Sequence, residues 1–88
     1  MFKQGKGKEK MKVEQIGSNM TQVSANGMTI LISYKTPVAC HIQGKGYYKT
    51  AKHWSVTTSK HISKWLRSND YSEVTEKPQD FFDNLLEG

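Results

Sequence analysis

The sequence is poor in cysteine and in long apolar runs. Its 88 residues include one cysteine, Cys40, which excludes an internal disulfide and a cysteine-rich zinc site. No apolar stretch approaches the roughly 18 residues that a membrane-spanning helix needs, and no apolar segment of a signal peptide follows the basic residues 1–10. We therefore expect a cytoplasmic protein that does not contact membranes, with one small core.

Carboxylates are scarce over most of the chain. Residues 1–67 hold twelve Lys or Arg side chains against two acidic ones, Glu9 and Glu14, whereas residues 68–88 hold six acidic side chains against one lysine. This asymmetry is typical of a body that binds a polyanion, followed by an acidic segment. Because the basic body offers so few carboxylates for acid–base chemistry, we expect no enzymatic activity. A nucleophilic site in which a serine or cysteine lies beside a histidine base depends on tertiary contacts, which the sequence pattern does not reveal.

Glycine and lysine dominate residues 1–10, which show no apolar periodicity and are predicted to form a disordered basic arm. Residues 11–88 are predicted to form a single small domain. Alternation of apolar and polar residues predicts short strands at 11–16, 20–25, 28–34, 38–42 and 47–50. Pro37 cannot donate a ladder hydrogen bond, so a bulge or corner is expected beside it.

The dipeptide Asn26-Gly27 is the strongest turn signal, because both central positions of a type I′ turn need a positive φ. It predicts a tight hairpin in which Val23 faces Ile30. The apolar side chains on that face are predicted to form the core: Val23, Ala25, Met28, Ile30 and Ile32.

Two helices are predicted after residue 56. Ile62, Trp65 and Leu66 recur at helical spacing, with the hydroxyl groups of residues 57–59 as expected N-caps. Pro78 suits the start of a final helix at about 79–87. The order of elements predicts an α+β fold: a small antiparallel β-meander of four or five strands followed by two short helices packed on one face.

Three segments together resemble a family of short uncharacterised proteins encoded by phages and other mobile elements. They are TILISYKTPVA at 29–39, GYYKT at 46–50 and WSVTTSKHISKWL at 54–66. The resemblance implies a genomic context, not an activity. Small proteins of this origin commonly bind nucleic acid or act on host machinery.

Cations and aromatic rings are interleaved in the second hairpin, and cations also line one side of the first helix. Such a surface can contact phosphates and stack bases. The candidate residues for contact with nucleic acid or another partner are Lys45, Tyr47, Tyr48, Lys49, Lys52, Lys60, Lys64 and Arg67. We expect one of the two tyrosines and Trp54 to lie in the core, and the other tyrosine and the lysines to lie on the surface. Ordinary solvated charge is the alternative interpretation.

Three further groups of residues are candidates for binding an anion, a partner or a metal. Thr57, Thr58 and Ser59 form a candidate anion site at the start of the first helix, although capping alone explains these hydroxyls. The final helix carries an apolar stripe, which either covers the sheet or docks on a partner: Phe81, Phe82, Leu85 and Leu86. Cys40 and His41 point to opposite faces of a strand, so we expect no metal and no other cofactor.

Two functions follow from these patterns. The first is a small non-enzymatic protein that binds nucleic acid, DNA or RNA, through the basic-aromatic surface. The alternative is a protein-binding inhibitor or modulator of a host enzyme or defence complex, comparable to an anti-CRISPR protein. Association into a homodimer is left open.

Overall fold

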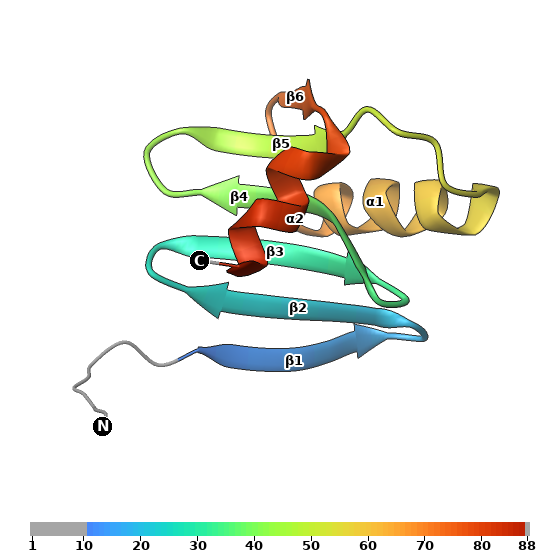
Figure 1. Cartoon of the computed structure of the whole chain (residues 1–88), viewed down its shortest axis with the longest axis horizontal. Coiled ribbons are helices and arrows are strands. Elements are labelled where there is room, and N and C mark those ends of the chain that lie inside the picture. Colours follow the sequence, from blue (N-terminus) through green and yellow to red (C-terminus); the bar gives the residue numbers. More distant parts are fainter. Residues whose placement is uncertain (1–10, 88) are drawn as a thin grey trace.

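The computed structural model describes residues 11–87, with side chains described through Leu85. Residues 1–10, for which a disordered arm is predicted, lie outside the described residues. The elements follow the order β1 (Lys12–Gly17), β2 (Met20–Ala25), β3 (Met28–Ser33), β4 (Thr36–Ile42), β5 (Gly46–Thr50), α1 (Val56–Ser68), β6 (Val74–Lys77) and α2 (Gln79–Glu87). The fold is α+β: the six strands form one sheet in chain order (Figure 1).

The β2–β3 hairpin has the predicted turn and register. Asn26 and Gly27 adopt φ values of 54° and 74°, as a type I′ turn requires. Val23 pairs with Ile30, and the pairing continues without interruption to the ends of both strands. The local turn signal therefore fixes which residues of these strands share a face.

The predicted irregularity beside Pro37 is also present. The register between β3 and β4 shifts between Leu31 and Ile32, as in a β-bulge. Val38 and Ala39, although consecutive, both belong to the hydrophobic cluster around Leu31. At this bulge, two successive apolar side chains therefore point to the same face of the sheet.

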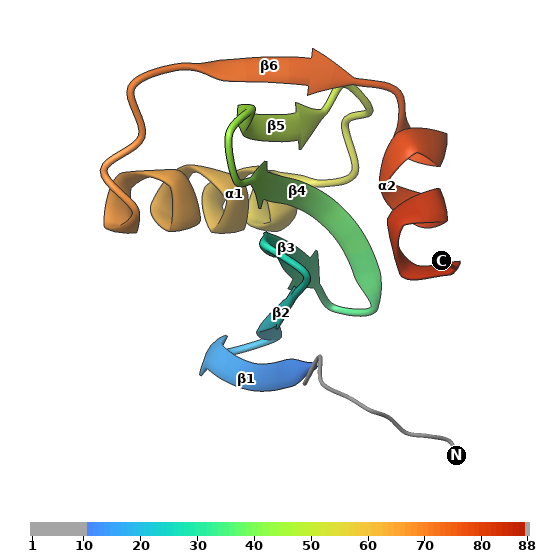
Figure 2. The ribbon, with the colours of Figure 1, turned by 90° about the vertical axis from the view of Figure 1, so that its left-hand side faces the viewer.

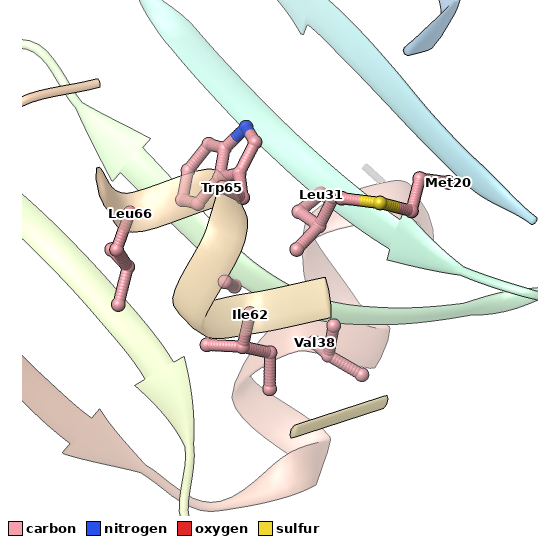
Figure 3. Close-up of a cluster of buried hydrophobic side chains, with 7 residues drawn as sticks. Met20, Leu31, Val38, Ile62, Trp65 and Leu66 are labelled. Atoms are coloured by element: carbon pink, nitrogen blue, oxygen red, sulfur yellow. The ribbon is translucent and has the colours of Figure 1, made fainter. Parts of the chain in front are cut away.

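Helix α1 packs on one face of the sheet and forms the first core (Figure 3). The stripe of Ile62, Trp65 and Leu66 is buried, as predicted, and it contacts side chains of β2, β3 and β4. The expected N-caps are wrong. Ser55 is the N-cap, and its Oγ accepts a hydrogen bond from the Thr58 backbone N–H at 3.1 Å.

Helix α2 packs on the opposite face, so the prediction that both helices share one face is wrong (Figure 2). Phe82 of α2 is fully buried against Ile30 and Cys40. Ile30 and its neighbour Leu31 point to opposite faces and are both buried. Because the central strands are apolar on both faces, each face needs its own helix.

Strand β6 is the sixth strand, one more than predicted. It pairs with β5 in parallel, with Tyr47 opposite Val74 and Thr50 opposite Lys77. Its four residues contain a single apolar side chain, so no alternation pattern marks it. The strand anchors the acidic segment to the sheet edge.

Candidate polyanion-binding site

A hollow lies between α1 and the edge formed by β5 and β6. It encloses about 340 Å³, and it continues along the strand–helix connection at residues 51–53. Its charged and aromatic lining residues are Lys49, Lys52, His53, Arg67, Tyr71 and Glu76. Antiparallel pairing of β4 with β5 and parallel pairing of β5 with β6 place these distant residues around one space.

A second hollow of about 580 Å³ runs along the outer side of α1. Lys60, Lys64 and Arg67 line it and are exposed, as their spacing opposite the buried stripe predicts. His53 and Arg67 line both hollows, so the two form one continuous surface. We call this surface the α1–β5 groove.

The α1–β5 groove is strongly cationic. Five cationic side chains and one carboxylate line it. The carboxylate, Glu76, lies 4.0 Å from the Lys49 ammonium group, and the Lys52 ammonium group lies 4.1 Å above the Trp54 ring. Within the described residues, no carboxylate lies within 4.0 Å of the three cations on α1.

The two tyrosines of β5 lie on opposite faces and are both half-buried. Tyr47 packs against His41 and Trp65, with ring centroids 4.4 and 5.9 Å apart. Tyr48 packs against Phe81 on the α2 face, at 5.6 Å. The expectation of one inner and one outer tyrosine is therefore wrong, and Tyr48 lies on the face away from the groove.

Trp54 is not a core residue, contrary to expectation. Its side chain is 41% exposed, and its Nε1–H donates to Gln79 Oε1 at 3.0 Å. Lys45, another candidate, lies in the exposed β4–β5 turn and is not among the residues lining the groove. The groove instead gains Tyr71, which is 39% exposed and follows α1, where no periodic pattern marks it.

The residues of the candidate anion site have separate environments. Thr57 is exposed, and Ser59 lines the α1–β5 groove. Thr58 is buried: its backbone N–H is taken by Ser55 Oγ, and its Oγ1 hydrogen-bonds with Ser33 Oγ at 3.0 Å. The helix start is thus occupied by a side chain of the protein, and of the three candidate residues only Ser59 lines the α1–β5 groove.

Ser33 and His61 are brought together by the packing of α1 on β3. Ser33 Oγ lies 2.8 Å from His61 Nδ1, and the Tyr34 ring lies 5.8 Å from the imidazole. Ser33 is 2% exposed, and it shares its hydroxyl with Thr58. A substrate therefore has little access to this hydroxyl, and the cluster connects the helix to the sheet.

Replacement of Ser33 by alanine is expected to lower the free energy of unfolding by about 1–3 kcal/mol, because the buried Thr58 hydroxyl loses its partner. Urea denaturation followed by circular dichroism measures the change. Ser63→Ala, at an exposed position of the same helix, is the control and should remain within about 0.5 kcal/mol of the unmodified protein. Equal stabilities of the two variants would contradict the structural role.

Cys40 and His41 point to opposite faces, as predicted. Cys40 is fully buried beneath α2, and burial raises the pKa of its thiol to about 11. The thiol is therefore protonated near neutral pH and is a poor nucleophile. Within residues 11–87, no three His, Cys, Asp or Glu side chains are grouped so that they could hold a metal ion.

The apolar stripe of α2 covers the sheet, one of its two predicted roles. Phe82 is buried, and Phe81 and Leu85 are half-buried in the second core. The side chain of Leu86 lies outside the described residues. The described part of the stripe is thus engaged within the protein.

A family model matches residues 11–84, which include every strand and most of α2. The chain belongs to DUF8033, a family of unknown function. No curated protein and no solved structure matches the chain. Neither helix of the described part is long and apolar enough to cross a membrane.

Proposed function

We propose that this DUF8033 protein is a non-enzymatic nucleic-acid-binding protein that contacts the phosphate backbone through the α1–β5 groove. The observation that carries the proposal is the row of Lys60, Lys64 and Arg67, exposed along one side of α1 and continuous with the hollow beside β5. A row of cations along a helix can contact successive phosphates of a nucleic-acid backbone.

The composition of the groove supports this partner class. Tyr71, which is 39% exposed, lines the same hollow as Arg67 and offers a ring on which an unpaired base could stack. Glu76 partly neutralises Lys49, so the α1 cations supply most of the attraction. A phage or mobile-element origin, which the sequence resemblance over about residues 11–66 implies, would agree with a role on nucleic acid in a host cytoplasm.

The test is fluorescence anisotropy of labelled single-stranded DNA, duplex DNA and RNA, titrated with the full chain at several salt concentrations. Salt-sensitive, saturable binding is expected. The triple variant Lys60→Ala/Lys64→Ala/Arg67→Ala should stay folded and bind at least about tenfold more weakly. For duplex DNA, its dependence of log K on log salt should be shallower by about 2–3 units.

A pair of double variants with equal loss of charge provides the control. Lys60→Ala/Arg67→Ala removes cations of the groove, whereas Lys35→Ala/Lys45→Ala removes exposed cations outside its lining. Only the first pair should weaken binding substantially. Equal weakening by both would indicate attraction by net charge alone and would contradict a defined site.

The alternative partner is an acidic protein surface, as expected of a modulator of a host enzyme or defence complex. The same cations favour it, because a carboxylate-rich surface and a phosphate backbone attract the groove alike. The described stripe of α2 is packed on the sheet, so such a partner would use the α1–β5 groove. Absence of binding to all three nucleic acids would favour this alternative.

A further inference from the structure

The two edges of the sheet differ in how they are protected. β6 has four residues and is followed at once by Pro78, features that shorten an edge and limit further pairing. β1 has six residues, five of them exposed, and Val13 is 62% exposed. It lies at the end of the sheet beyond the two helices (Figure 2). Among the described residues, no strand pairs with the outer side of β1, so β1 is the open edge of the sheet.

The hydrogen-bonding direction of each β1 residue follows from the β2–β3 hairpin. In a tight two-residue hairpin the residues flanking the turn exchange hydrogen bonds, and this repeats at every second residue. Ala25 flanks the turn and Asn19 accepts from Tyr34 N–H at 2.8 Å, so odd-numbered residues of β2 bond to β3. The even-numbered residues bond to β1.

The same alternation identifies which backbone N–H and C=O groups of β1 point away from β2. Ser24 pairs with Lys12 and Gln22 pairs with Glu14, so the backbone groups of Lys12 and Glu14 point to β2. The backbone groups of Val13 and Gln15 then point away from the sheet. Only residues with outward groups can form hydrogen-bonded pairs with an added strand.

We propose that β1 pairs in antiparallel fashion with β1 of a second copy of this chain, with Val13 on the two-fold axis. In this register Val13 of each copy forms a hydrogen-bonded pair with Val13 of the other. Lys12 then lies opposite Glu14 of the other copy, and this charged pairing occurs twice. The side chains of such a non-hydrogen-bonded pair lie close together, with Cα atoms about 4.5 Å apart.

The neighbouring symmetric registers are less favourable. An axis at Lys12 places two ammonium groups opposite each other, and an axis at Glu14 places two carboxylates opposite each other. An axis at Gln15 places Glu14 opposite Ile16, next to the irregularity that β1 has between Gln15 and Gly17. The charge pattern of β1 therefore selects the axis at Val13.

The proposed pairing joins two six-stranded sheets into one. Its two-fold axis is perpendicular to the sheet, so both α1 helices lie on the same face. A short strand pair buries little surface, so the dimer is expected to dissociate on dilution. The pairing is independent of the proposed nucleic-acid binding, and the tests use nuclease-treated protein at physiological salt.

Sedimentation velocity of the full chain across micromolar to millimolar concentrations tests the association. The weight-average mass is expected to rise from 10.0 kDa towards that of two chains. Val13→Pro removes an outward N–H without removing a hydrogen bond to β2, so it should stay folded by circular dichroism and remain monomeric. A mass that stays at 10.0 kDa throughout for the unmodified chain would overturn the proposal.

Charge reversal and cross-linking test the register. Lys12→Glu should weaken association at least about tenfold, and Lys12→Glu/Glu14→Lys should restore it.

Val13→Cys should form a disulfide-linked dimer under mild oxidation, because hydrogen-bonded pairs have Cα atoms about 5.5 Å apart. Gln15→Cys is the control and should not cross-link. The buried native Cys40 leaves the assay undisturbed. Equal or stronger cross-linking of Gln15→Cys, or no rescue by the charge exchange, would overturn the register.

Discussion

Ile30→Asp is expected to abolish folding. Ile30 is 3% exposed, pairs with Val23 and Cys40 on the flanking strands, and contacts the second core beneath α2. A carboxylate there would be buried without a partner, which costs several kcal/mol on top of the lost packing. Domains of this size have total stabilities near the lower end of about 5–15 kcal/mol. Circular dichroism and urea denaturation should show no cooperative transition.

Thr29→Asp is the matched control for this change. Thr29 precedes Ile30 on β3, points to the opposite face and is half-exposed, so its carboxylate would remain hydrated. This variant should unfold cooperatively with a modest loss of stability. If both aspartate variants folded equally well, the assignment of faces on β3 would be wrong.

Phe82→Ala is expected to lower the free energy of unfolding by about 3–5 kcal/mol. The Phe82 ring is fully buried and is the central contact of α2 with the sheet, so its loss leaves a cavity above Ile30 and Cys40. Chemical denaturation measures the change, and at the upper end of the range the domain would be largely unfolded.

Asn84→Ala serves as the control on the same helix. Asn84 is exposed, so its truncation should change stability by no more than about 0.5 kcal/mol. A small effect of Phe82→Ala, similar to that of Asn84→Ala, would mean that α2 does not cover the second face. That result would contradict the arrangement of helices on both sides of the sheet.

The elements that could be predicted from sequence are those with local signals. Asn26-Gly27 determines its own turn, and the turn determines the register of the hairpin around it. Ile62, Trp65 and Leu66 mark one side of α1, and Pro78 marks the start of α2. In each case the spacing of a few nearby residues is sufficient.

The features that were missed depend on contacts between distant residues. β6 is held by parallel pairing with β5, more than twenty residues earlier, and four mostly polar residues give no pattern for it. The assignment of helices to faces also failed. The predicted core contains only the face of Ile30, whereas Leu31 is fully buried on the opposite face, so β3 needs a helix on each face.

In the candidate site, too, the residues with a local pattern could be predicted, and those brought in by tertiary contacts could not. The spacing of Lys60, Lys64 and Arg67 places them on one side of α1 from sequence alone. Tyr71 and Glu76 join the groove only because β6 returns to the sheet beside β5. Tyr48 was expected near the same cations, but strand alternation turns it towards α2.

The burial of Cys40 beneath α2 has a consequence for the order of synthesis. A ribosome makes β4 about forty residues before Phe82, so the thiol has no cover until α2 emerges and docks. In the finished protein, a thiol reagent reaches Cys40 only when α2 lifts or the sheet opens. The rate at which Cys40 is labelled therefore reports how often α2 detaches or the sheet opens.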